Sequence, residues 1–205
     1  MAYPSVTAPY GLLPINLIGG QVFAGATRQI PIASNSATAI FYGDVVKLAN
    51  TGLLVQDTGT DAATPVGVLL GCSYTDPVFG KTFRQYYPGA VYASDIVAFV
   101  ADDPDQLFKV AVVSATTTIG YVNRSNVGNN ALLVQNVGST ITGNSAVAIL
   151  ATTATTNTYP IRIIDVVPET AIAGYPGSYT EVIVKWNAPT TGAVGGHQYT
   201  QPTGV

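Results

Sequence analysis

Apolar residues alternate with small or polar residues in one short segment after another along this chain of 205 residues. An alternation with a period of two places the apolar side chains on one face of a β-strand, so each such segment predicts a strand with one buried face. The segment at 40–49 is interrupted by Tyr42, Gly43 and Asp44, where we expect a break in the strand. The predicted strands lie within residues 28–34, 40–49, 52–57, 66–74, 95–101, 106–113, 131–138, 146–150, 159–167 and 179–186.

No segment shows the 3.6-residue period of an amphipathic helix. The 21 glycines and 13 prolines fall largely between the predicted strands, which follow one another at intervals typical of a sandwich or a barrel. The fold class predicted from this pattern is all-β, with one or two small antiparallel β-barrels or a sandwich.

A faint internal repeat bears on whether there are one or two units. The stretch GLLVQDTG (52–59) resembles ALLVQNVG (131–138), and each precedes a short apolar strand. Two hairpins with similar chemistry by chance are the favoured explanation, and two related barrels in tandem are the alternative. On the second interpretation the units join near residue 102, which gives an extended N-terminal arm (1–27), a first barrel unit (28–101), a second (102–187) and a Gly/Thr-rich C-terminal tail (188–205).

The N-terminal arm carries apolar side chains on a segment that Pro4, Pro9 and Pro14 keep from forming a helix. Two interpretations stay open: the arm completes the first sheet of its own domain, or it docks on a neighbouring subunit or partner. It has no basic residue before Arg28, so it resembles neither a signal peptide nor a membrane span. Its candidate interface residues are Tyr10, Leu12, Leu13, Ile15, Leu17 and Ile18.

Charge is scarce, at 9% of residues against roughly 25% in an ordinary soluble domain. Few solvated side chains favour a protein that covers its surface with copies of itself or with another protein. The net charge of −3 and the scattered basic residues exclude a phosphate-binding track, so we expect no nucleic-acid partner.

Catalytic groups are also scarce. The one histidine, His197, lies in the Gly/Thr-rich tail, where we expect a surface or interface role rather than that of a positioned base. The one cysteine, Cys72, shares its alternation with Val66 and Val68, which predicts a small buried side chain rather than a reactive thiolate. The remaining carboxylates form no signature, so we expect no enzyme, no cofactor and no small-molecule substrate.

Asp102, Asp103 and Asp105 form the densest cluster of charge, in VADDPDQLFKVAV (100–112). Three carboxylates so close together suggest a cation site, but the spacing lacks the distal glutamate of an EF-hand. Asp-Pro and Pro-Asp are also ordinary turn chemistry. We expect a charged turn between the two units, with a cation as the alternative.

The twelve tyrosines have an apolar body and a polar tip, which suits either a protein interface or the rim of a β-core. Tyr86, Tyr87 and Tyr199 join the arm residues and His197 as candidate contacts with a partner protein or another subunit.

Taken together, the strand and turn phrases resemble those of a known family. They are AGATRQIPIAS, FYGDVVKL, ATPVGVLLGCSYTDP, DDPDQLFKV, VGNNALLV, GNSAVAI, PIRIIDVVP, EVIVKWN and HQYTQPTGV. They resemble capsid decoration (cement) proteins of tailed bacteriophages, most closely small virion proteins of phages that infect cyanobacteria and other aquatic bacteria.

The resemblance implies a barrel or a jelly-roll or β-tulip-like fold on the outer surface of an HK97-type head. It also implies a homotrimer that contacts the major capsid protein and clamps neighbouring capsomers, and it carries no active site. Another virion component, such as a tail or fibre protein, and a glycan-binding adhesion module are the alternatives.

Overall fold

The computed structural model describes residues 6–170, 178–187 and 196–200. It is 42% strand and 3% helix, which confirms the all-β fold class. The strands are β1 (Leu13–Leu17), β2 (Arg28–Pro31), β3 (Val45–Leu48), β4 (Leu54–Gln56), β5 (Gly67–Asp76), β6 (Gly80–Arg84), β7 (Val97–Ala101), β8 (Gln106–Val113), β9 (Asn130–Val134), β10 (Ala148–Ala154), β11 (Ile161–Val166) and β12 (Glu181–Trp186). Two 3₁₀ turns lie at Arg124–Asn126 and Gln198–Thr200.

The strands after residue 105 form a closed barrel. Its order is β8–β10–β9–β11–β12, and β12 pairs back with β8. Every pair in the ring is antiparallel except β8–β10, which is parallel. The alternation predicted at 106–113 gives β8 its inward side chains, with Phe108 packed at 5.4 Å against the ring of Trp186.

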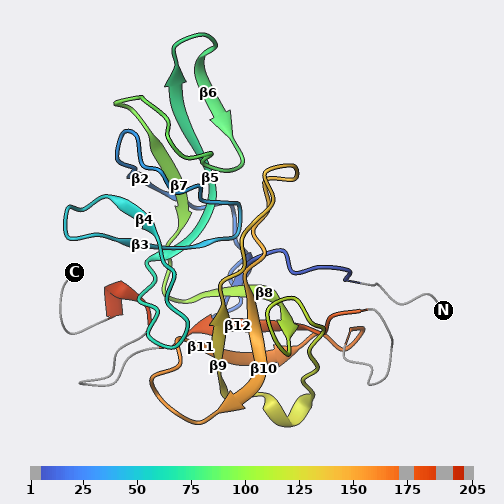
Figure 1. The fold of residues 1–205 in the computed structure, drawn as a ribbon. Coiled ribbons are helices and arrows are strands. Elements are labelled where there is room, and N and C mark those ends of the chain that lie inside the picture. Colours follow the sequence, from blue (N-terminus) through green and yellow to red (C-terminus); the bar gives the residue numbers. More distant parts are fainter. Residues whose placement is uncertain (1–5, 171–177, 188–195, 201–205) are drawn as a thin grey trace.

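Five of the strands between residues 28 and 101 repeat the pairing order of the barrel. They lie above the barrel in Figure 1. Their order is β2–β7–β5–β3–β4, and a parallel bridge between Ile32 and Leu54 links the end of β2 to β4. If β2, β3, β4, β5 and β7 are matched to β8 through β12 in chain order, each pairing and each strand direction corresponds. The first and third strands are parallel in both units. The hairpin strand β6 is an addition to the first unit, where it pairs with β5.

The sequence repeat does not follow this structural repeat. Residues 52–59 contain β4, the third strand of the first unit, whereas residues 131–138 contain β9, the second strand of the second unit. The two stretches are therefore similar because both are apolar β-strands, not because they occupy corresponding positions in the two units. The topology, rather than these residues, relates the two units.

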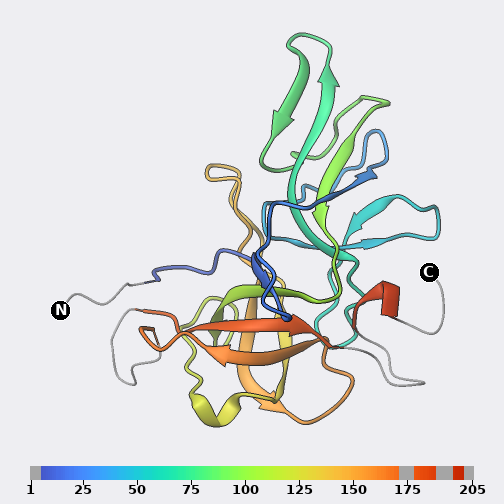
Figure 2. The same ribbon diagram turned by 180° about the vertical axis from the view of Figure 1, so that it is seen from behind.

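The N-terminal segment contributes a strand to the second unit, not the first. β1 pairs antiparallel with the beginning of β8, on the edge that β10 uses farther along (Figure 2). Of the two interpretations of the arm, the one in which it completes the first sheet was wrong about the sheet, because Leu12 packs against apolar residues of the second barrel. Leu12 is fully buried and belongs to the core of that barrel.

One hydrophobic cluster runs between the two units. It joins Val45 and Val68 of the first unit to Phe108, Ile149 and other residues inside the second barrel. A separate cluster, including Ile30, Leu69 and Tyr87, fills the first unit. Because the units share a core, they pack as parts of one body.

Candidate interaction surfaces

The Asp cluster forms the turn between β7 and β8. The backbone N–H of Asp105 donates to Asp103 Oδ1 over 2.8 Å, as in an Asx turn. Asp102 pairs with Arg28 at 2.5 Å and Asp105 with Lys185 at 2.7 Å. Within the described residues no group of three metal-ligating side chains could hold a metal ion. Two of the three carboxylates, those of Asp102 and Asp105, therefore pair with basic side chains of the same chain.

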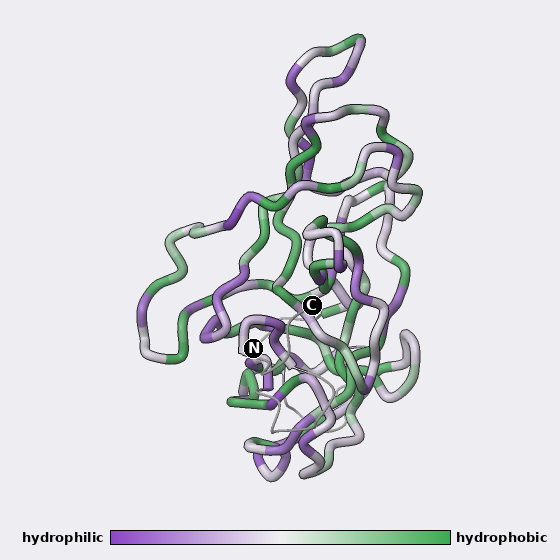
Figure 3. Tube along the Cα trace, turned by 90° about the vertical axis from the view of Figure 1, so that its left-hand side faces the viewer, coloured by the Kyte–Doolittle hydropathy of each residue, from purple (hydrophilic) through white to green (hydrophobic). Residues whose placement is uncertain are grey.

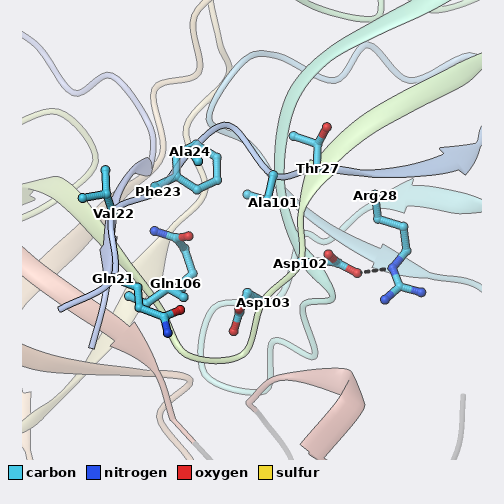
Figure 4. Close-up of a pocket in the computed structure, with 12 residues that line it drawn as sticks. Gln21, Val22, Phe23, Ala24, Thr27, Arg28, Ala101, Asp102, Asp103 and Gln106 are labelled. Atoms are coloured by element: carbon cyan, nitrogen blue, oxygen red, sulfur yellow. Dashed lines mark hydrogen bonds and ion pairs between the residues drawn. The ribbon is translucent and has the colours of Figure 1, made fainter. Parts of the chain in front are cut away.

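A groove of about 520 Å³ lies beside this turn (Figure 4). Val22, Phe23 and Ala24, from the exposed link between β1 and β2, form one side of it, and Asp102 and Asp103 form the other. Its lining includes carboxylates and a guanidinium but neither a thiol nor an imidazole. The groove can hold a small group in contact with the link, and it offers no nucleophile–base pair.

His197 is buried, which corrects the expectation of a surface position. The segment 196–200 packs against the first unit: Gly196 N–H donates to the Ala63 carbonyl, and the side-chain amide of Gln198 bonds both backbone groups of Leu48. The remainder of the predicted tail, 188–195 and 201–205, lies outside the described residues. Burial lowers the pKa of His197, and its Nδ1 accepts the N–H of Tyr199.

Cys72 is buried and unpaired with another cysteine, which confirms the predicted burial. Burial raises the pKa of its thiol to about 11, so it is protonated at neutral pH. A bulge at Leu70 shifts the alternation of β5, and Cys72 therefore packs with Leu69 rather than with Val68.

The carboxylates of Asp44 and Asp57 are also buried, and each accepts backbone N–H bonds in a turn.

The candidate arm residues divide by burial. Leu12 is fully buried and therefore presents no side-chain surface to a partner. Tyr10 is part-buried, and its hydroxyl bonds Glu181 of the second barrel. Leu13, Ile15 and Leu17 are half-buried along β1, and Ile18 is exposed.

The other candidates divide in the same way. Tyr87 is fully buried, where its hydroxyl donates to the Ser36 carbonyl, so it presents no surface either. Tyr86 is half-buried and stacks on Phe41 with ring centroids 5.3 Å apart. Tyr199 is exposed, and the guanidinium of Arg28 lies 5.3 Å from its ring centroid. The structure does not bring these residues together into one patch with the arm.

The β5–β6 hairpin holds exposed apolar side chains that the sequence did not single out. It extends away from the second barrel, and hydrophobic residues reach its tip (Figure 3). Val78 and Phe79 are each 79% exposed and Phe83 is 71% exposed. Asp76 Oδ1 accepts the N–H groups of both Val78 and Phe79, which holds the tip. The Asp-Pro and Phe-Gly pairs at 76–80 were the available signal, because they mark a tight turn between the strands predicted at 66–74 and 95–101.

The connection between β9 and β10 is a second exposed projection. It rises from the second barrel alongside the first unit (Figure 1). Val137 is 88% exposed and Ile141 is 95% exposed. Sequence reasoning missed it because an apolar residue among Gly, Ser, Thr and Asn carries no periodic signal.

Among the residues that the structure describes, none forms a helix long and apolar enough to cross a membrane. Comparisons of the chain with protein-family models, with curated proteins and with solved structures found no match in any of the three.

Proposed function

We propose that this chain is a structural virion protein, a decoration or cement protein on the outer surface of a tailed-phage head. It contacts the major capsid protein, clamps neighbouring capsomers and self-associates, with a homotrimer as the expected order. The observation that carries the proposal is the β5–β6 hairpin, which extends from the two-unit body with Val78, Phe79 and Phe83 exposed.

Exposed aromatic and aliphatic side chains at a held tip are the usual anchors of a protein interface. The tip is ordered by its own backbone bonds to Asp76, so binding loses little conformational entropy. The ring of Phe83 also stacks on that of Phe99 in β7, with centroids 6.4 Å apart, which continues the aromatic surface from the hairpin onto the neighbouring strand. These features support a docking role for this end of the molecule.

The chemistry elsewhere supports a structural role over an enzymatic one. The one thiol and the one imidazole of the chain are both buried, and the thiol is protonated at neutral pH. The three clustered aspartates are part of a turn, and two of them are paired with Arg28 and Lys185. These groups hold the fold together, which leaves them poorly placed to act on a substrate.

The proposed mechanism is mass action on a shell. A protein that binds across two capsomers only in their expanded arrangement stabilises that arrangement by its binding free energy. Many symmetric copies then act together, so modest affinity per copy is sufficient.

The test is binding to heads that lack this protein, from the virus that encodes it. Wild-type protein is expected to saturate the heads, and Phe79→Asp to weaken binding at least tenfold, as for a central interface anchor. Val22→Asp, at a similarly exposed apolar site on the β1–β2 link, is the matched control and is expected to bind as wild type.

Equal binding of wild type and Phe79→Asp would remove the hairpin from the contact. No binding by wild-type protein would overturn the function. Exposed aromatic side chains also suit a glycan surface, so a glycan array with binding that free sugar competes away would support the adhesion alternative instead.

A further inference from the structure

The β9–β10 loop, residues 135–145, is held by its own hydrogen bonds. Ser139 N–H donates to the Asn144 carbonyl, and Gly143 N–H donates to the Ser139 carbonyl. Tyr42 N–H and the Gln85 side-chain amide donate to Gly143 and Asn144, which fastens the loop to the first unit. The loop therefore presents its tip in a fixed position.

The base of the loop lies tightly against Phe41. A Cβ at Gly138 would lie 2.5 Å from the Phe41 ring, so glycine is required for this approach. Beyond the base, Val137 and Ile141 are almost fully exposed, as described above. We call this fixed, uncharged projection, residues 135–145 with Ile141 exposed, the knob.

A groove of about 450 Å³ lies beside the base of this knob. Ala39 and Phe41 line it from the first unit, Gln56 and Thr58 from β4 and the residues that follow, and Val137 from the loop itself. Its volume is within the range of pockets that bury a small ligand, so it is large enough for an isoleucine side chain. Ile141 of the same chain does not line this groove; it lines a separate, shallower hollow together with Arg84 and Tyr86.

Neither surface is charged. Residues 135–145 (QNVGSTITGNS) include no ionisable side chain, and neither do the residues that line the groove. An acidic or basic partner would lose solvation at this groove without gaining an ion pair. A neutral segment with a small apolar tip matches it, and the chain presents such a segment next to the groove.

We infer that the knob of one copy inserts Ile141 into the groove beside Phe41 of a second copy, so that residues 135–145 and this groove form the self-association surface of the protein. The inference takes only the expectation of self-association from the proposed function. It is tested in solution without heads, so its failure and that of the proposed function are distinguishable.

The first experiment measures mass by light scattering over a wide concentration range. Wild-type protein and Val78→Asp, at another highly exposed apolar site on the β5–β6 hairpin, are expected to form the same oligomer. Ile141→Asp is expected to raise the dissociation constant at least tenfold while keeping the wild-type circular dichroism spectrum. A monomeric wild type, or an oligomer that Ile141→Asp leaves intact, would overturn the inference.

The second experiment identifies the contact. Chains with Ile141→Cys are mixed with separate chains carrying Ala39→Cys and oxidised mildly; the native Cys72 is buried and gives little background. The expected product is a disulfide-linked pair containing one chain of each kind, with much less from Val78→Cys mixed with Ala39→Cys. Equal yields from the two mixtures would contradict the insertion.

Discussion

The hydroxyl of Tyr10 donates a hydrogen bond to the carboxylate of Glu181 over 2.5 Å, and the ammonium of Lys109 lies 3.1 Å from the same oxygen. This relationship ties the N-terminal segment to β8 and β12 of the second barrel. It explains why a sequence segment that looks like a free arm is part of the body. Tyr10 is therefore expected to stabilise the fold rather than to contact a partner.

Replacing Tyr10 by Phe removes the hydroxyl and leaves the buried carboxylate with one fewer donor. The free energy of unfolding in urea is expected to fall by about 2 kcal/mol, as for a hydrogen bond to a charged group. Tyr92→Phe alters a tyrosine that is exposed and is expected to change it by less than about 0.5 kcal/mol. Equal effects of the two changes would show that the Tyr10 bond contributes nothing to stability.

Leu12→Ala is expected to lower the free energy of unfolding by about 2–5 kcal/mol, because it leaves a cavity in the core of the second barrel. Ile18→Ala, just beyond β1 on an exposed side chain, is expected to stay within about 0.5 kcal/mol of wild type. A wild-type stability for Leu12→Ala would mean that the N-terminal segment leaves the barrel in solution. By the same reasoning, deletion of residues 1–20 destabilises the fold rather than removing only a contact arm.

The pH dependence of stability carries a contribution from His197. Burial lowers its pKa from the ordinary value of 6.5, while the nearby Asp102 and Asp103 carboxylates and the Val66 carbonyl oppose that shift. Below pH 6.5 the unfolded chain takes up a proton that the folded chain does not. Stability is therefore expected to decrease as the pH falls from 6.5 towards the lower folded pKa.

The measurement compares urea unfolding of wild type and His197→Gln between pH 7.5 and pH 5. The variant is expected to show a shallower loss of stability over this range. Because the untagged chain has one histidine, its imidazole C–H signal in an NMR titration reports the folded pKa directly. A folded pKa at or above 6.5 would contradict the burial argument.

Chelation tests the carboxylate turn. Asp102 and Asp105 are paired with Arg28 and Lys185, so excess chelator is expected to leave the melting temperature unchanged. A fall of several degrees that added Ca²⁺ reverses would restore the cation alternative for Asp102, Asp103 and Asp105.

The alternation of apolar residues was sufficient to predict most strands. In β8 and β12, for example, buried and less buried side chains alternate along most of the strand, so the pattern can be read from a few consecutive residues. The hairpin strand β6 was missed because GKTFR has no buried face of its own and depends on pairing with β5. The burial of His197 and Tyr87 could not be predicted locally. His197 is covered by residues more than ninety positions away, including Asp102, and Tyr87 bonds Ser36.

Among the candidate contact residues, the expectation of an accessible side chain was wrong for Leu12, Tyr87 and His197, which are buried, and the other candidates stay predictions. Leu12 looked free in a proline-rich segment, but it packs beside a barrel whose first strand begins at Gln106. The projecting side chains of Val78, Phe79 and Ile141 are single apolar residues in turn-like sequence. Their exposure depends on how the two units are placed, which no short pattern encodes.

The central claim is tested most directly by the amount of this protein on purified, DNA-filled heads of the virus that encodes it, measured against the major capsid protein by quantitative mass spectrometry. The account predicts a fixed, near-stoichiometric ratio that persists through gradient purification and is lost when heads are assembled with the Phe79→Asp variant. Absence of the protein from such heads, or its recovery only with tails or fibres, would contradict it.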